Sequence, residues 1–256
     1  MDNKGKTPLV TVIMPIYNNM NTVRQSVDSF LSQTMPDLEL FIIDDGSKDN
    51  TYEIIKELAE KDQRITILKN ECNLGVAASR NKALDLARGE YIAFLDSDDI
   101  WTEHKLEKQI ALLEKTNGDI CYTSYDFIDY AGRPIKRAPY IVPLKTNYHD
   151  MLRENVIGLS TALIRYNALG ELRFDSRWFH EDYVLWLTLL CAGKIACGLQ
   201  EVLVTYRTGG RSSNKINVAK NRWKIYREHQ KLSMPKALYY FCCYAYNGIK
   251  KRIKIK

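Results

Sequence analysis

Three aspartates within four positions, Asp96, Asp98 and Asp99, directly follow the apolar run 91–95 in the stretch YIAFLDSDDIW. Like charges this close cost free energy unless a cation or a hydrogen-bonding ligand offsets them. Carboxylates without histidine or cysteine favour a hard ion such as Mg²⁺ or Mn²⁺, which binds one or two carboxylates together with substrate phosphates. The stretch therefore predicts a metal-diphosphate site. The alternative is that the acids form a turn and cap the next helix.

Two further groups of charged residues are candidates for the same chemistry. Arg80, on a helix predicted at 75–89, would add a cation for the same phosphates. The pair Glu181-Asp182 opens another predicted helix, where the helix dipole alone already favours acids. The stretch DDGS at 44–47, taken alone, is best explained as a turn.

The elements that must position these residues alternate between strand and helix over the first 125 residues. Asn50 and Glu53 predict a capping box for the second helix, and Thr102 predicts a cap for the fourth. The alternation predicts a Rossmann-like α/β fold with a mostly parallel sheet flanked by helices, and ligands beyond the carboxyl ends of the strands. The predicted strands are 9–15, 38–44, 64–70, 91–96 and 119–128, and the predicted helices are 20–34, 51–61, 75–89 and 103–116.

The regular alternation stops after Tyr130. A further strand is predicted at 161–165, a helix at 181–193 that ends at Gly193, and a last strand at 201–207. Composition agrees with one sizeable core, since 45% of the 256 residues are hydrophobic.

The location of the protein is predicted from what the sequence lacks. No stretch reaches the roughly 20 apolar residues that span a bilayer, and the N-terminal sequence predicts no signal peptide. The six cysteines have neither CxxC nor zinc spacing, so we expect reduced thiols and a cytoplasmic protein.

The C-terminal segment 215–256 is strongly basic. It holds 12 of the 37 Lys and Arg but one of the 31 acids, so it carries +11 while the rest carries −5. Aromatic residues beside this charge suit an anionic membrane surface, and the apolar run 237–246 is too short to span. The alternative is a helical hairpin that packs on the body. We expect no nucleic-acid partner because no recognisable nucleic-acid module is present.

Five stretches, in order along the chain, resemble the inverting glycosyltransferases of family 2, which have the GT-A fold. Two more, IGLSTALIR (157–165) and TYRTGGRSSNK (205–215), resemble bacterial enzymes that build teichuronic acid, O-antigen or capsule. The resemblance covers about residues 9–210. The five stretches are VTVIMPIYNN (10–19), FIIDDGSKDNT (41–51), NLGVAASRNKAL (73–84), GEYIAFLDSDD (89–99) and HEDYVLWL (180–187).

The resemblance implies a domain organisation and a set of partners. A GT-A domain would occupy residues 1–214, with the nucleotide-sugar half at 9–125 and the acceptor and catalytic half at 126–214. The basic helical extension 215–256 would lie on the membrane. The donor would be a UDP-sugar and the acceptor a lipid-linked saccharide, so the enzyme would be peripheral at the inner face of the bacterial plasma membrane.

The resemblance also implies roles on the donor side. Pro15 and Tyr17 would line the nucleotide base, and Asp45 would hydrogen-bond uracil. Arg80 would lie near the base and the diphosphate. The DxD motif would be Asp96-Ser97-Asp98: Asp96 lies near the ribose and the metal, and Asp98 coordinates Mn²⁺ or Mg²⁺.

On the acceptor side, the resemblance makes Asp182 the catalytic base. Members of the family often have a histidine after the last strand that adds to the metal or diphosphate shell. This chain has none there, so Arg207, Arg211 and Ser212 are the candidate substitutes for diphosphate binding.

Two rival functions remain open from the sequence. A sugar-phosphate nucleotidyltransferase also uses carboxylates, a metal and an α/β sheet, but its Gly-rich, Arg-containing loop is replaced here by PIYNNMNTVRQS (15–26). A non-catalytic membrane- or nucleic-acid-binding module would use the acids only structurally, and it predicts no UDP binding.

Overall fold

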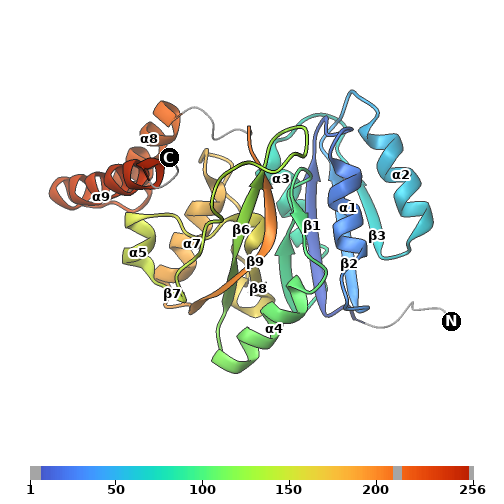
Figure 1. Ribbon diagram of the computed structural model, residues 1–256, viewed down its shortest axis with the longest axis horizontal. Helices are drawn as coiled ribbons and strands as arrows, with labels where there is room; N and C mark the ends of the chain where they lie inside the picture. Colours follow the sequence, from blue (N-terminus) through green and yellow to red (C-terminus); the bar gives the residue numbers. More distant parts are fainter. Residues whose placement is uncertain (1–6, 210–214, 254–256) are drawn as a thin grey trace.

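A nine-stranded sheet forms the centre of the protein, with the order β3-β2-β1-β4-β8-β6-β9-β5, and β7 pairs with β9 (Figure 1). The structure is a computed structural model that describes residues 7–209 and 215–253. The strands are β1 (Val10–Ile16), β2 (Leu38–Asp44), β3 (Ile65–Lys69), β4 (Tyr91–Phe94), β5 (Ile100–Trp101), β6 (Ile120–Ile128), β7 (Lys145–Thr146), β8 (Leu163–Arg165) and β9 (Ala196–Arg207).

Six of the strands run in the same direction. Strands β3, β2, β1 and β4 are parallel, and so are β6 and β9. The short strand β8 is antiparallel to both β4 and β6, so β6 runs in the same direction as β4. Strands β5 and β7 are antiparallel to β9. The predicted α/β fold with a mostly parallel sheet is therefore confirmed. The carboxyl ends of six strands meet at one edge, where a ligand site is expected.

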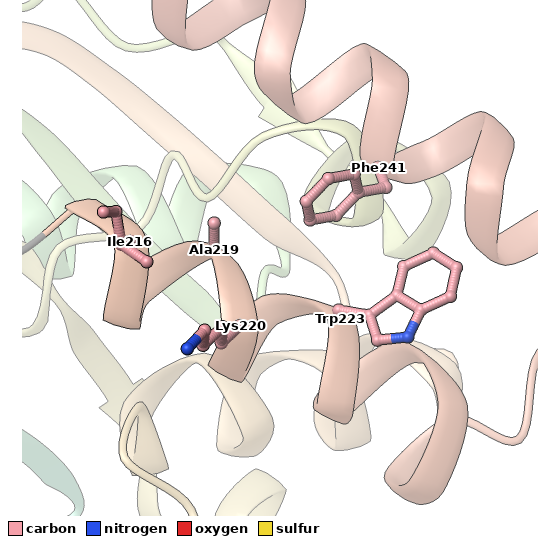
Figure 2. Close-up of a pocket in the computed structure, with 5 residues that line it drawn as sticks. All are labelled: Ile216, Ala219, Lys220, Trp223 and Phe241. Atoms are coloured by element: carbon pink, nitrogen blue, oxygen red, sulfur yellow. The ribbon is translucent and has the colours of Figure 1, made fainter.

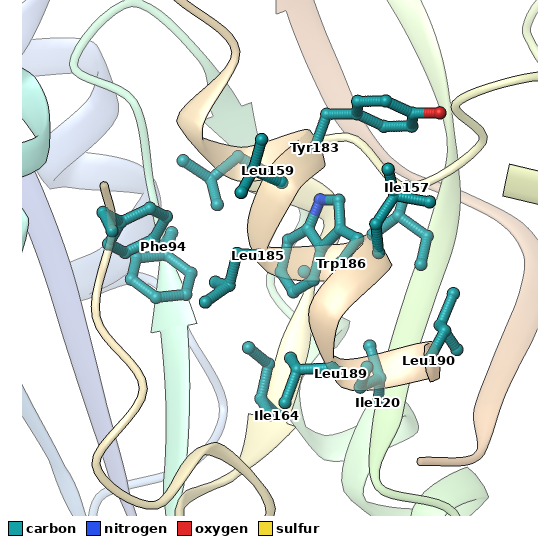
Figure 3. Packing of buried hydrophobic residues seen from close by; sticks show 14 of the residues in the cluster. Phe94, Ile120, Ile157, Leu159, Ile164, Tyr183, Leu185, Trp186, Leu189 and Leu190 are labelled. Atoms are coloured by element: carbon teal, nitrogen blue, oxygen red, sulfur yellow. The ribbon is translucent and has the colours of Figure 1, made fainter. Parts of the chain in front are cut away.

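Helices cover both faces of the sheet, and alternate residues of a strand face opposite layers. In β1, Val12 and Met14 pack under α1 (Val23–Leu31), α2 (Thr51–Lys61) and α4 (Lys105–Thr116), while Ile13 belongs to the opposite layer. Figure 3 shows Trp186 of α7 among Ile120, Ile157 and Ile164 in that opposite layer. Its helices are α3 (Val76–Leu84), α5 (Tyr148–Arg153), α6 (Tyr166–Leu169) and α7 (Glu181–Cys191).

Two predicted helix caps are wrong. The Asn50 side chain makes no capping hydrogen bond; the Asp49 carboxylate accepts instead from the Thr51 N–H at 3.0 Å. Helix α4 begins at Lys105, because the Thr102 N–H bonds the Leu203 carbonyl and so extends the pairing of β5 with β9. A contact with distant β9 therefore determines where α4 begins, whereas α2 begins at Thr51 as predicted.

The C-terminal segment forms a helical hairpin that packs on the body, as the sequence alternative expected. It comprises α8 (Lys215–Lys224), a π-helical turn (Ile225–His229) and α9 (Met234–Ile253), and lies at the left of Figure 1 beside α5 and α7. Tyr226 and Ala237 are fully buried, and the Tyr148 hydroxyl donates to Gln230 at 2.7 Å. Among the described residues, no helix has the length and apolar character needed to cross a bilayer.

Candidate active site

The loops after β1 and β2 are tied together at the carboxyl edge. The Asn18 N–H donates to the Ser47 hydroxyl at 3.1 Å, and the Lys48 N–H donates to the Asn18 side-chain oxygen at 2.8 Å. Gly46 has φ +75, and a Cβ there would lie 3.0 Å from the Cys72 backbone, so both conformation and space require glycine. The DDGS stretch is therefore a turn, as predicted, and hydrogen bonds connect it to the end of β1.

Asp45 organises the next loop at this edge. Its carboxylate accepts from the Asn70 side chain at 2.8 Å and from the backbone N–H groups of Leu74 and Gly75 at 2.9 and 2.8 Å. The side chain is only 3% exposed. It thus fixes the loop that leads from β3 into α3.

The residues predicted to bind the nucleotide base do come together. The Asp45 N–H donates to the Ile16 carbonyl at 2.9 Å, so Asp45 lies beside Pro15 and Tyr17 at the end of β1. Pro15 is buried within the strand, whereas the Tyr17 side chain is 44% exposed. An exposed aromatic ring on a polar ledge can stack on a planar base.

The three aspartates after β4 differ in their surroundings. Buried Asp99 accepts from the Ser160 hydroxyl at 2.5 Å and from the Arg207 N–H at 3.1 Å. The same Ser160 oxygen accepts from the Asp96 N–H at 3.1 Å. Asp99 is therefore held by the protein, whereas Asp98 makes no ion pair with any described residue. Ser97 between the acids is buried.

A bound cation would stabilise the ionised carboxylates of this cluster. Burial, with the neighbouring Asp96, raises the pKa of Asp98 to about 6. Burial, with Asp98 and Asp96, raises the pKa of Asp99 well above its ordinary value. For Asp98 and Asp99, burial and repulsion between the acids outweigh the stabilising contacts with the described residues.

A divalent ion fits this donor set when the substrate supplies part of its shell. No three His, Cys, Asp or Glu side chains in the described ranges are grouped so as to hold a metal ion by themselves. Mg²⁺-type ions usually take one or two carboxylates, with the remaining ligands from phosphates and water. Asp98, with Asp96 beside it, matches that pattern.

Arg80 joins the aspartate cluster to the acids of α7. Its guanidinium, 3% exposed, contacts Asp96 at 2.8 Å and Glu181 at 2.7 Å. The guanidinium carbon lies 5.3 Å from the Phe174 ring centroid. The Arg80 guanidinium was predicted to bind phosphates. In this structure it instead forms ion pairs with two acidic motifs, at positions 96 and 181, which are 85 positions apart.

The two acids of the ED pair are divided in the same way. Glu181 is buried against Arg80, whereas Asp182, in the first turn of α7, is partly exposed. Burial, followed by repulsion from Glu181, raises the pKa of Asp182 to about 6. A carboxylate with a pKa near neutrality, still open to solvent, is suited to general-base chemistry.

Arg207 has a different position from the one expected of a diphosphate ligand. Its guanidinium donates to the Asp98 carbonyl at 3.0 Å, the Tyr130 carbonyl at 3.0 Å and the Gln25 side chain at 2.8 Å. With these contacts, Arg207 is better placed to hold the DxD loop in position than to bind a phosphate directly. The other two candidate substitutes, Arg211 and Ser212, lie outside the described residues.

Sequence reasoning missed Ser160 and the separate roles of the acids. Ser160 is fully buried in the short 3₁₀ turn Leu159–Thr161 and contacts both Asp96 and Asp99. Its only sequence signal was membership of the IGLSTALIR stretch, because its partners lie more than 60 positions away.

Comparison with known proteins gives the same picture. Residues 11–172 match the family described as Glycosyl transferase family 2. TuaG of Bacillus subtilis (strain 168), a glycosyltransferase assigned to teichuronic acid biosynthesis, is 38% identical over 96% of this chain and 98% of its own. WfgD of Escherichia coli, named UDP-Glc:alpha-D-GlcNAc-diphosphoundecaprenol beta-1,3-glucosyltransferase, is 37% identical over 95% of this chain and 94% of its own.

Solved structures share the fold at low sequence identity. S. aureus TarS 1-349 in complex with UDP-GlcNAc has a TM-score of 0.69 at 19% identity, covering 92% of this chain and 71% of its own. The mannosyltransferase PcManGT from Pyrobaculum calidifontis, in complex with GDP-Man and Mn²⁺, has a TM-score of 0.71 at 19% identity, covering 94% and 70%. The chain therefore belongs to glycosyltransferase family 2 and is a glycosyltransferase with the GT-A fold.

Proposed function

We propose that the protein transfers a sugar from a UDP-sugar to a hydroxyl of a lipid-linked saccharide, with inversion at the anomeric carbon, in cell-surface polysaccharide biosynthesis. One observation carries this proposal: Arg80 brings the DxD acids and the ED acids into a single site, with Asp98 and Asp182 left free of ion pairs among the described residues. The names of TuaG and WfgD support the substrate classes.

The donor nucleotide would lie on the ledge at the ends of β1 and β2. Tyr17 would stack on the uracil ring, Pro15 would form the floor, and Asp45 would hydrogen-bond the base edge while it holds the loop before α3. Asp96 and Ser97 would lie against the ribose and diphosphate. TarS, of similar fold, was solved with UDP and with UDP-GlcNAc.

Asp98, with Asp96, would hold Mn²⁺ or Mg²⁺ next to the diphosphate. When bound, this ion would neutralise the charge that develops on the departing UDP. Arg207 would keep the loop in place by binding the Asp98 carbonyl. Residues Arg211 and Ser212 stay candidates for the outer side of the diphosphate.

Asp182 would take the proton from the acceptor hydroxyl. The acceptor oxygen then attacks the anomeric carbon from the side opposite UDP, which inverts the configuration. Glu181 would be neutralised by its ion pair with Arg80, so that it does not repel the reacting oxygen. The same ion pair would hold the first turn of α7 in place.

UDP binding tests the donor half of the proposal. We expect wild-type protein to bind UDP in the presence of Mn²⁺, and Asp98→Asn to weaken this binding at least about tenfold, because the amide lacks the charge that holds the ion. Isothermal calorimetry with Mn²⁺ and with EDTA measures both effects. The Asp85→Asn variant, an exposed aspartate at the end of α3, is the matched control.

UDP calorimetry and a separate assay of pyrophosphate release distinguish the rival functions. If the wild type fails to bind UDP in either buffer, the UDP-sugar proposal is wrong and a non-catalytic binding module gains support. If UDP binds but the protein instead joins a nucleoside triphosphate to a sugar phosphate, with release of pyrophosphate, the nucleotidyltransferase reading is correct.

The membrane surface is the proposed partner of the C-terminal hairpin, which would make the enzyme peripheral at the inner face of the plasma membrane. An apolar groove of about 570 Å³ lies between α8 and α9, with Lys220 at its rim (Figure 2). The outer face of α9 exposes apolar side chains next to Lys236 and Lys250. Exposed apolar side chains beside cations suit an anionic lipid surface. The residues are Ile216, Ala219, Trp223 and Phe241 in the groove, and Met234, Leu238, Tyr239 and Tyr246 on the outer face.

Vesicle binding tests this proposal. We expect the protein to sediment with phosphatidylglycerol vesicles but not with phosphatidylcholine vesicles, and about 0.5 M salt, roughly three times the physiological ionic strength, should weaken the binding. Leu238→Glu should reduce the binding about tenfold, whereas Leu86→Glu, an exposed leucine on the body, should not. Equal binding by both variants and the wild type would show that the hairpin only packs on the body.

A further inference from the structure

Tyr206 lies in the site without an assigned task. It precedes Arg207 in β9, and its ring packs edge-on against Tyr125 at 4.7 Å between centroids. In the described parts of the chain, no hydrogen bond involves its hydroxyl, and this oxygen is not among the fully buried atoms without a partner. The Tyr206 side chain is partly exposed, so its hydroxyl is a hydrogen-bond donor without a protein acceptor among the described residues.

Three acids of the site influence the Tyr206 hydroxyl. Burial raises the pKa of Tyr206 well above its ordinary value, and Asp99, Asp96 and Asp182 add to the shift in that order. The geometry agrees for the DxD acids, because Gly158, which adjoins the Tyr206 hydroxyl, lies two residues before Ser160, the partner of Asp96 and Asp99. At neutral pH the Tyr206 hydroxyl stays protonated, so it can donate a hydrogen bond.

Gly158 leaves room for the hydroxyl of this tyrosine. A Cβ on Gly158 would lie 2.4 Å from the Tyr206 hydroxyl oxygen and 3.1 Å from the ring carbon that carries it. The φ of Gly158 is −77°, which any residue adopts, so the backbone does not require glycine. The requirement is space: glycine lets the hydroxyl reach its position above the turn that carries Ser160.

We propose that the Tyr206 hydroxyl donates a hydrogen bond to the transferred sugar of the donor, and that Gly158 preserves the space for it. The inference rests on the proposed function. The DxD acids mark the diphosphate and Asp182 marks the attacking hydroxyl, so the sugar must lie between them. Tyr206 lies against the turn whose Ser160 bonds Asp96 and Asp99, and its hydroxyl has no hydrogen-bond partner among the described residues.

The test compares UDP with sugar nucleotides. Calorimetry in Mn²⁺ gives the affinities of UDP, UDP-glucose and UDP-N-acetylglucosamine for wild type and Tyr206→Phe. We expect the variant to bind UDP as the wild type does and to lose roughly tenfold in affinity for at least one sugar nucleotide. Tyr125→Phe, which removes a hydroxyl from the ring in contact with Tyr206, is the matched control and should lose nothing.

Gly158→Ala provides a second, independent arm. The added methyl should displace the Tyr206 hydroxyl, so this variant should show the same selective loss, and its effect should be smaller in the Tyr206→Phe background. Equal losses for UDP and the sugar nucleotides, or no loss in Tyr206→Phe, would overturn the inference. So would a wild type that binds UDP but neither sugar nucleotide. A wild type that does not bind even UDP would instead overturn the proposed function.

Discussion

Asp182→Asn is expected to lower kcat by about 10²–10⁴-fold while UDP affinity stays within about twofold of the wild type. The amide has nearly the shape of the carboxylate but cannot accept the proton of the acceptor hydroxyl. Of the two acids in the ED pair, Asp182 is partly exposed, whereas Glu181 is buried and paired with Arg80. The measurement is UDP release with UDP-glucose and a diphosphoundecaprenol-linked N-acetylglucosamine, next to calorimetry with UDP.

The pH dependence of the rate follows from the same group. Burial and Glu181 raise the pKa of Asp182 to about 6, and the ionised form is the proposed base. The kcat/KM of the wild type should therefore fall up to about tenfold per unit as the pH drops below 6, and be level above about 7. Asp182→Asn should lose this slope. UDP affinity measured over the same range separates the base from Asp98, whose pKa is also raised to about 6.

Asp150→Asn is the control for the charge change, since the Asp150 side chain on α5 is 45% exposed and pairs with the partly exposed Arg153. It should keep full activity. A normal kcat in Asp182→Asn would remove this residue from the chemistry. A loss of UDP binding equal to the loss of kcat would show that Asp182 shapes the donor site rather than acting on the acceptor.

The first half of the fold could be predicted from sequence because its strands are short, apolar and separated by amphipathic helices. The later elements were harder. Strand β9 begins at Ala196, five positions before its predicted start, because pairing with β6 and β7 extends it beyond the apolar pattern. In the predicted helical segment 215–256, α8 ends at Lys224 and a π-helical turn with buried Ile225 and Tyr226 follows, which no local pattern indicated.

The membership of the site could be predicted in the same way, but the roles within it could not. Parallel strands end at one edge, so the acids after β2 and β4 had to lie close together. Which acid remains free depends on distant partners: Asp99 is taken by Ser160, 61 positions away, and Glu181 by Arg80, 101 positions away. In each pair, Asp98-Asp99 and Glu181-Asp182, one carboxylate is bound by the protein and the other is available for a ligand. The local sequence does not indicate which of the two is bound.

Arg80→Met is expected to destabilise the protein by about 3–5 kcal/mol, the second largest effect we predict. The substitution keeps much of the side-chain volume but leaves Glu181, only 3% exposed, without its cation. Urea unfolding measures the loss. Arg173→Met, which breaks the exposed pair with Asp85, should cost about 0–1 kcal/mol. A loss below about 1 kcal/mol in Arg80→Met would contradict the bridge.

A second substitution identifies the source of the loss. If the cost comes from the unpaired charge on Glu181, the double variant Arg80→Met/Glu181→Gln should regain more than half of it, because no buried carboxylate then lacks a cation. If the cost comes from packing against Phe174, the double variant should be no more stable than Arg80→Met. Regained stability without regained UDP binding would further show that Arg80 is needed at Asp96 as well. Since Arg80 is the residue that contacts both motifs, it would then fix the position of the donor relative to the base.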